Sequence, residues 1–249
     1  MKKAIIRLIL MCFCAVPEIA CAQFVNHAPA KKFVEVDVHV FSGSTGITQN
    51  YAGKFSEITE CNADNGTGYG LGAGAVFGLR QWFGFGTEMN VTVNHNKVNL
   101  AVSNHENVSM SNIFVRNRYT YLNFPIFLSF RFNILDGLRW NVDAGFYYSY
   151  GIWGKQDQTI YNSTLNDLGQ LVPRTVVTKC GYFNSSSTFI NSYRRNDIGL
   201  HIATALQFGN HFFIGARCQV GFKNVAYNSG LVNPNIHNFN FMGAAGYKF

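Results

Sequence analysis

Two histidines and two serines are the side chains whose types could support hydrolysis. His39, His201, Ser129 and Ser149 lie on polar faces of alternating segments, among carboxylates such as Asp37. A converging serine, histidine and carboxylate can activate the serine oxygen as a nucleophile. Lipid would have to reach such a group, yet the apolar faces of these segments carry no serine or histidine. A lipid hydrolase or acyltransferase is therefore an alternative interpretation and not the first one.

Metal and nucleotide sites find less support. The chain has no Cys-x-x-Cys or His-x-x-x-His spacing of the kind that metal sites use. The glycine-rich run from Gly68 to Gly72 looks like part of a nucleotide-binding loop, but no helical pattern follows it. We therefore expect no cofactor.

The elements that carry these residues are eight segments in which apolar residues alternate with small or polar ones. The segments are residues 33–41, 68–79, 83–94, 119–132, 140–151, 197–208, 212–223 and 238–249. Alternation with a period of two is typical of β-strands with two different faces. One face carries no charged residue. The other carries nine, namely Glu35, Asp37, Glu88, Arg131, Asp143, Asp197, Arg217, Lys223 and Lys248.

The chemistry of the two faces indicates a transmembrane barrel. Charged residues make up only 13% of the chain and aromatic residues 15%. The longest apolar run, residues 8–16, is too short for a membrane-spanning helix. Outer-membrane barrels place apolar residues toward lipid and small or polar residues in the lumen. We predict an all-β fold, an eight-stranded antiparallel up-and-down transmembrane β-barrel with long extracellular loops; a soluble lipocalin-like barrel is the alternative.

The connections predict the orientation. Long connections, residues 42–67, 95–118, 152–196 and 224–237, alternate with short ones, residues 80–82, 133–139 and 209–211. In bacterial outer-membrane barrels the short turns are periplasmic and the long loops extracellular. We therefore expect a cell outer-membrane location with periplasmic termini. Tyr247 and the final Phe249 share a face, which is typical of the signal that barrel-assembly machinery recognises during insertion.

The first residues resemble a secretory signal peptide. Basic residues precede the apolar run, and a small-residue cleavage motif surrounds Cys21. Residues 1–22 are the predicted signal, and residues 23–249 form a single barrel domain. A lipoprotein with an acylated Cys21 is disfavoured, because Glu18 stands where a leucine-like residue is expected.

The nine charged residues are expected to form a lumenal polar network. The interior of an eight-stranded barrel is just wide enough for side chains to fill, and an unpaired buried ion costs several kcal/mol. The charges should therefore pair, with a proton or small-ion path as the alternative. The inward glycines of residues 68–79 would make room for larger side chains opposite them. Pro125 removes a ladder hydrogen bond, so we expect a local bulge there.

Four arginines stand where the second and third long loops re-enter the barrel. They are Arg116, Arg118, Arg194 and Arg195. Arginine suits bidentate contact with phosphate, which the outer leaflet supplies in quantity. These residues are a candidate lipid-phosphate rim facing lipopolysaccharide; an ordinary solvated loop base is the alternative. In this location the net charge of +7 does not indicate a nucleic-acid partner.

Three cysteines follow the signal segment. Cys61 falls in the first long loop and Cys180 in the third, so a disulfide between them is plausible in an oxidising compartment. Cys218 belongs to an apolar face and is expected to be inert in lipid.

Several of these segments resemble the PorT-like outer-membrane β-barrel family. The resemblance is carried by Tyr121-Leu122-Asn123-Phe124-Pro125-Ile126-Phe127-Leu128, Asp197-Ile198-Gly199-Leu200, Ile214-Gly215-Ala216-Arg217, Val220-Gly221-Phe222-Lys223-Asn224-Val225 and Gly246-Tyr247-Lys248-Phe249. Asn123 departs from it, because the family would place an acidic residue there, and a lumenal salt bridge is in doubt. The resemblance implies a barrel fold; the namesake of the family is tied to protein secretion and gliding.

The first functional interpretation is a non-enzymatic outer-membrane barrel whose long loops bind an unknown protein or surface ligand or protect the envelope, since ordered long loops commonly carry function. The alternatives are an accessory barrel for protein secretion, the lipid enzyme described above, and a narrow pore. Outer-membrane lipids, lipopolysaccharide included, are expected partners in every case.

Overall fold

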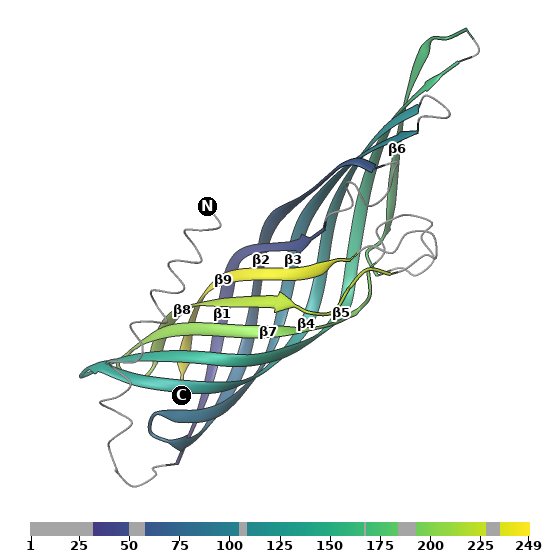
Figure 1. Cartoon of the computed structure of the whole chain (residues 1–249). Helices are drawn as coiled ribbons and strands as arrows, with labels where there is room; N and C mark the ends of the chain where they lie inside the picture. The colour runs from purple at the N-terminus through teal and green to yellow at the C-terminus, as the bar shows by residue number, and fades with distance from the viewer. Residues whose placement is uncertain (1–31, 50–57, 105–108, 167, 184–192, 228–234) are drawn as a thin grey trace.

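A computed structural model describes residues 32–49, 58–104, 109–166, 168–183, 193–227 and 235–249 (Figure 1). These residues form nine strands: β1 (Phe33–Thr48), β2 (Ile58–Arg80), β3 (Phe83–Asn104), β4 (Ser109–Leu135), β5 (Leu138–Leu165), β6 (Leu171–Gly181), β7 (Asn196–Phe208), β8 (Phe212–Gly221) and β9 (His237–Lys248). The predicted signal segment lies outside the described residues. Within the described ranges, no helix is long and apolar enough to cross a bilayer.

Eight of the strands close into a barrel. The order around the ring is β4-β3-β2-β1-β9-β8-β7-β5, and pairing between β4 and β5 closes it. Every pair is antiparallel. The predicted eight-stranded antiparallel up-and-down barrel is confirmed. Closure gives each strand of the ring two neighbours, so the ring leaves no open sheet edge in the membrane-spanning part.

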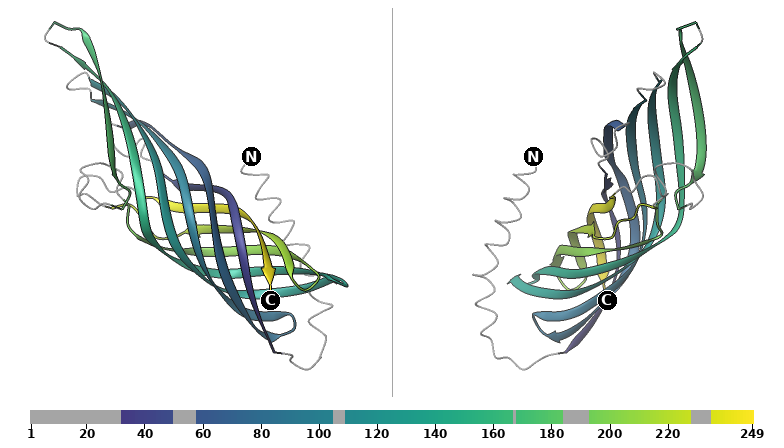
Figure 2. Two further views of the ribbon diagram at one scale, coloured as in Figure 1. Left: turned by 180° about the vertical axis from the view of Figure 1, so that it is seen from behind. Right: turned by 45° about the vertical axis from the view of Figure 1, so that its right-hand side comes forward.

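The ninth strand, β6, is not predicted by the sequence. One edge of β5 pairs with β4, while its other edge pairs first with β7 over residues 138–150 and then with β6 over residues 155–165. The hairpin of β5 and β6 projects well beyond the ring (Figures 1 and 2). The prediction that residues 152–196 form one long loop is therefore wrong.

The first two predicted loops are also too long. Residues 42–48 and 58–67 belong to β1 and β2, and residues 95–104 and 109–118 belong to β3 and β4. Strand pairing continues past the apolar band into water. There the outer face becomes polar, so apolar and polar residues no longer alternate clearly. The sequence pattern therefore predicts a loop where the structure has strands.

The two ends of the barrel differ. The turn end, as we call it, holds the short connections between β2 and β3, β4 and β5, and β7 and β8. The β4–β5 turn is only Asp136-Gly137, shorter than the predicted connection 133–139, and Gly137 has φ +80°. Asp-Gly suits such a tight hairpin because both central residues need positive φ. The opposite, extended end carries the β5–β6 hairpin.

Two bulges change which residues point inward. The β2–β3 register shifts between Asn65 and Tyr69, and the β4–β5 register shifts by one residue where Thr120 pairs with Trp153 and Tyr121 with Gly151. The extra residue, Ile152, reverses the alternation of β5. Odd-numbered residues of β5 face the interior before it, and even-numbered residues do so after it.

The bulge expected at Pro125 does not occur. Thr87 pairs with Ile126 on one side of the proline and Asn90 pairs with Asn123 on the other, in the same register. The Thr87 hydroxyl donates to the Pro125 carbonyl at 3.1 Å. The missing backbone donor therefore leaves the spacing of β3 and β4 unchanged.

Candidate functional site

The interior of the barrel at its turn end is organised around Glu35 on β1. Arg131 Nη1 donates to Glu35 Oε1 at 2.6 Å, and Lys248 Nζ donates to Glu35 Oε2 at 3.2 Å. Arg139 Nη1, from the start of β5, lies 3.4 Å from the same carboxylate. The Arg131 guanidinium also lies 4.1 Å from the centre of the Phe33 ring. Strands far apart in sequence thus share one ion cluster.

A second cluster lies deeper and is centred on Glu88. Arg217 donates to its carboxylate at 3.1 and 3.5 Å, and Asn90 Nδ2 donates to it at 2.8 Å. His39 Nδ1 lies 2.6 Å from Oδ1 of Asp37, and His39 Nε2 lies 2.8 Å from Oδ1 of Asn90. All five side chains are buried.

Glycine on β2 provides the room for this second cluster. A Cβ on Gly72 would overlap the side-chain amide of Asn90 and would lie 2.8 Å from Nε2 of His39. A Cβ on Gly74 would lie 2.8 Å from Oδ2 of Asp37. The inward glycines of β2 thus give space to bulky polar groups, as the sequence suggests.

Toward the extended end the interior is polar but nearly free of ion pairs. Asp197 accepts hydrogen bonds from the Tyr147 hydroxyl at 2.9 Å and from Asn238 at 2.8 Å. Asn123 donates to Gln219 Oε1 at 2.9 Å. Asn123, which replaces the acidic residue of the PorT-like pattern, is therefore held by a neutral amide.

Besides Asp197, two of the nine charged residues lie outside the Glu35 and Glu88 clusters. Asp143 lies on β5 beside a cavity of about 40 Å³ that Glu88 and Arg217 also line. Lys223 lies beyond the end of β8 and is half-buried. Its assignment to a strand of the lumen is wrong, because β8 ends at Gly221. Within the described residues, neither side chain forms an ion pair.

Side chains fill the interior between the clusters. The cavity beside Asp143 and another of about 10 Å³ near Asn123 are both small. Neither is large enough for more than a few waters. At these places the described part of the barrel is filled by packed polar side chains.

The candidate hydrolytic residues are not assembled. Both ring nitrogens of His39 face acceptor oxygens, which leaves neither available to take a proton from a hydroxyl. His201 Nδ1 lies 3.1 Å from Nε2 of Gln219. Among the described contacts, no hydrogen bond joins Ser129 or Ser149 to either histidine. The prerequisite geometry for a serine nucleophile is absent from this part of the chain.

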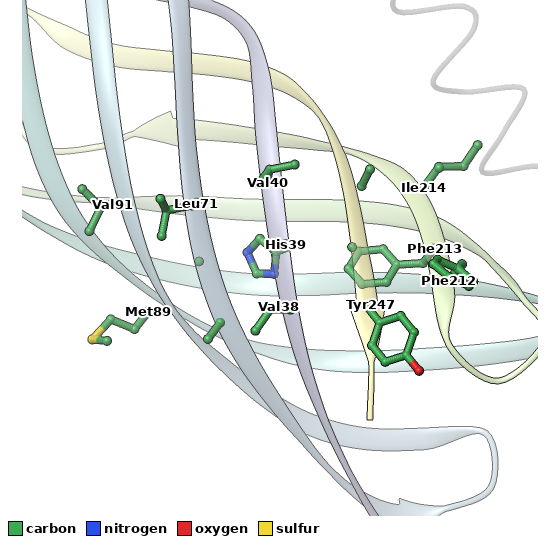
Figure 3. Close-up of a pocket in the computed structure, with 14 residues that line it drawn as sticks. Val38, His39, Val40, Leu71, Met89, Val91, Phe212, Phe213, Ile214 and Tyr247 are labelled. Atoms are coloured by element: carbon green, nitrogen blue, oxygen red, sulfur yellow. The ribbon is translucent and has the colours of Figure 1, made fainter.

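A hollow on the outer surface lies just outside His39. It measures about 710 Å³ and is lined mainly by outward apolar residues such as Val40, Leu71 and Ile214 (Figure 3). Gly72 and Gly246 make the wall thin at this point, but His39 itself is only 4% exposed. The hollow is thus a smooth apolar depression of the kind that lipid chains cover.

The four rim arginines separate into two pairs. Arg116 and Arg118 lie on β4 and point outward, exposed. Arg194 and Arg195 stand before β7, and Arg195 Nη1 donates to the carbonyls of Gly151 and Ile152 at 2.7 and 3.0 Å. Arg195 therefore supports the backbone beside the β5 bulge. The structure does not bring the four together as one ring.

An apolar core at the extended end was missed by the sequence analysis. Its fully buried centre is a stack in which Tyr182 lies between Tyr119 and Tyr193, with ring centroids 4.3 and 4.2 Å apart. Around the stack pack Ile47, Ile58, Val98, Leu100, Val115, Tyr121, Val225, Ala226 and Ile236. We call this set the tyrosine core. Burial raises the pKa of Tyr182 and of Tyr193 well above the usual value.

The tyrosine core combines residues of the strands with residues of the segments that connect strands. Its strand residues come from the concave side of the extended sheet, while residues 182, 193, 225 and 236 come from segments between strands. One signal was available: alternate residues Val98, Leu100, Val115 and Tyr119 continue the inward phase of β3 and β4 beyond the membrane-facing band.

Comparison with known proteins identifies the family of this chain. It matches the family described as outer membrane protein beta-barrel domain over residues 30–227. The chain belongs to that family. Among curated proteins no relative matches.

Solved barrels with low sequence identity are similar to this outer-membrane β-barrel. Ail, the attachment invasion locus protein of Yersinia pestis, crystallised with the heparin analogue sucrose octasulfate, is 11% identical, with 87% of this chain and 99% of that chain covered and a TM-score of 0.37. OprG from Pseudomonas aeruginosa is 9% identical, with 88% and 96% covered and a TM-score of 0.32.

In the described part of the outer-membrane β-barrel, Cys61 and Cys180 are not joined by a disulfide. Cys61 lies on β2, with its sulfur 3.9 Å from the Gln49 carbonyl oxygen, and Cys180 lies on β6 and donates to Gln156 Oε1 at 3.3 Å. Burial and the charge of Asp157 raise the pKa of Cys180. The structure therefore does not form the predicted disulfide, because the sulfur of Cys61 contacts Gln49 and that of Cys180 contacts Gln156.

The C-terminal residues of the outer-membrane β-barrel form an aromatic cluster at the turn end. Tyr247 stacks on His211 with ring centroids 5.0 Å apart and meets Phe212 edge-on at 5.2 Å. Phe249 is 70% exposed, and its backbone N–H donates to the Val36 carbonyl at 2.9 Å. Both aromatic side chains that the sequence singled out thus lie at the last pairing of β1 and β9.

Proposed function

We propose that this outer-membrane β-barrel is a non-enzymatic surface protein whose extended end binds a partner outside the cell. The proposal places the turn end and both termini in the periplasm and the β5–β6 hairpin in the external medium. The alternation of short and long connections supports that orientation. A PorT-like accessory role in secretion is the competing proposal, and it requires contacts on the periplasmic side.

One observation carries the proposal. The interior is packed at both levels, with ion clusters in the barrel and the tyrosine core beyond them, so the feature available for binding is the ordered sheet outside the ring. Single-channel recordings should accordingly show no discrete conductance. Steady conductance steps would support a pore instead.

The β5–β6 hairpin is the best candidate for the contact itself. Within the described strands, β6 pairs only with β5, so its other edge has backbone groups that can accept a further strand. Leu168 is 81% exposed, Leu171 66% and Val177 65%, which is more apolar exposure than a solvated hairpin needs. Arg174 and Lys179 flank the apolar middle of β6, and two copies paired antiparallel about Val176 and Val177 would oppose these like charges. A foreign segment with acidic residues suits the edge better.

Site-specific photo-crosslinking in intact cells tests this proposal. A crosslinker at Leu171 or Val177 should capture a protein, or fix the barrel to a surface polymer, whereas one at Asp136 in the β4–β5 turn should not. Capture from Asp136 alone would overturn the proposal and favour the secretion role. Folding of each variant is checked by its heat-dependent migration on gels.

A further inference from the structure

The outer face of β3, β4 and β5 changes character at one level. On β4 the outward residues from Phe130 to Thr120 carry no charge, and these eleven residues match what a tilted strand needs to cross the hydrocarbon layer. The next outward residue is Arg118. It pairs with His95 on β3 and with Lys155 on β5. Three neighbouring strands thus place a basic side chain side by side at the edge of the apolar band.

An aromatic residue fixes the depth of this basic row. Trp153, outward and 42% exposed, lies directly below it on β5. The Arg118 guanidinium lies 6.0 Å and the Lys155 ammonium 5.3 Å from the centre of the Trp153 ring. Tryptophan prefers the boundary between hydrocarbon and headgroups, so the basic row falls at the depth of the lipid phosphates.

A groove lies beyond the row, farther from the membrane. It measures about 560 Å³, within the range of ligand sites, and Lys97, Arg116, Asp64 and Asp157 line it. Two aromatic rings, Phe114 and Tyr161, meet edge-on at 5.7 Å in its wall. Such a mixture of charged and aromatic groups offers both hydrogen bonds and stacking surfaces to a sugar.

The cations of this surface are not neutralised by ion pairs. Each ion pair within 4.0 Å among the described residues lies inside the barrel, around Glu35, Glu88 and Asp37. The surface has four cations, Lys97, Arg116, Arg118 and Lys155. The acidic residues paired with them across the strands are Asp64 and Asp157, so the surface keeps an excess of positive charge.

We propose that this surface binds a phosphorylated glycolipid of the outer leaflet. Arg118 and Lys155 contact a lipid phosphate at the membrane boundary, and His95 adds a further hydrogen-bond donor. The sugars attached to the phosphate-bearing unit occupy the groove beside Phe114 and Arg116. Arg194 and Arg195 take no part, because Arg195 is bonded to the β5 backbone. The site is separate from the β5–β6 edge, so hairpin binding and glycolipid binding can fail independently.

The test uses the full barrel, folded in a neutral detergent, and native mass spectrometry. The probes are bisphosphorylated lipid A, lipid A carrying inner-core sugars, a dephosphorylated lipid A and inorganic phosphate. The variant Arg118→Gln/Lys155→Gln should bind bisphosphorylated lipid A roughly tenfold more weakly or worse, because it loses two charge-assisted contacts. Lys32→Gln/Arg80→Gln removes the same charge elsewhere on the exposed surface and should bind as the parent does.

The remaining arms separate the phosphate from the sugar and the lipid from a free ion. Core sugars should strengthen binding, and Phe114→Ala should remove that gain while leaving lipid A alone unaffected. Equal binding of the dephosphorylated lipid, equal loss in the two double variants, or displacement by inorganic phosphate at the same concentration as lipid would each overturn the proposal. Loss of crosslinking at the β5–β6 hairpin would not bear on it.

Discussion

The two levels of the barrel are built in opposite ways. In the membrane-facing part the outer face is apolar and the interior holds Glu35, Glu88, Arg131 and Arg217, whereas beyond it the outer face is charged and the interior holds the tyrosine core. The polar interior is held by ion pairs and hydrogen bonds between specific side chains, and the apolar one by contact area. What surrounds each level, lipid or water, thus determines what its interior can be made of.

Removing one half of a buried ion pair should have the largest effect. Arg217→Met leaves the buried Glu88 carboxylate without its cation, and such a loss costs about 3–5 kcal/mol of unfolding free energy. Urea titration of the barrel in lipid vesicles measures it. Glu88→Gln combined with Arg217→Met should recover part of the loss. A double variant as unstable as the sum of both single variants would show that the two side chains do not act as a pair.

Truncation of the tyrosine core should cost slightly less and act locally. Tyr182→Ala removes the middle ring of the stack, for which about 3 kcal/mol is expected. The effect should appear as faster protease cleavage in the β5–β6 hairpin, while the ring of strands keeps its heat-dependent gel migration. Cleavage at an unchanged rate, or loss of the folded gel band, would show that the two levels are not separate in stability.

Alkaline pH should destabilise the extended end more than the membrane-facing part, and this effect should be smaller than those of the two substitutions above. Because burial raises the pKa of Tyr182 and Tyr193 in the folded chain, their contribution to stability is complete below the unfolded pKa of about 10 and is lost as pH rises above it. Protease sensitivity of the hairpin should therefore increase above pH 10, and Tyr193→Phe should reduce the increase. Absorbance at alkaline pH should show these phenols ionising only when the extended end opens.

Replacing Cys61 or Cys180 by serine should have the smallest effect, namely no change in gel mobility. Because no disulfide joins Cys61 on β2 to Cys180 on β6, Cys61→Ser should leave mobility on non-reducing gels unaltered, and so should Cys180→Ser. A mobility shift seen in the parent and lost in both variants would show that the extended end closes a covalent link.

The sequence predicted the membrane-facing level well, since lipid imposes a strict alternation there. Val34 to Val40 and Phe241 to Phe249 show the outward phase directly, and the charged residues mark the inward phase. What it missed are pairings decided by register and by contacts distant in the chain. β6 exists because its residues pair with Lys155–Leu165, and the stack forms because Tyr182 contacts the distant Tyr119 on one side and Tyr193 on the other.

Some failures have narrower causes. Lys223 was assigned to a strand because the alternation runs on by one step after β8 ends. The rim arginines were grouped by their position at loop ends, yet Arg116 and Arg118 lie exposed on β4, whereas Arg195 donates to the backbone beside the β5 bulge. The sequence shows which residue types suit the membrane boundary, whereas the pairing register of the strands determines which of these residues lie on the same surface.

The one-residue bulge at Ile152 has a consequence for engineering and for sequence drift in this chain. Deleting Ile152 would rotate everything after it on β5 by half a period, sending Lys155 and Asp157 toward the tyrosine rings and exposing Gln156 and Gln158. A substitution between Gly151 and Gly154 would keep the alternation of β5, whereas a loss or gain of one amino acid there would exchange its inward and outward faces.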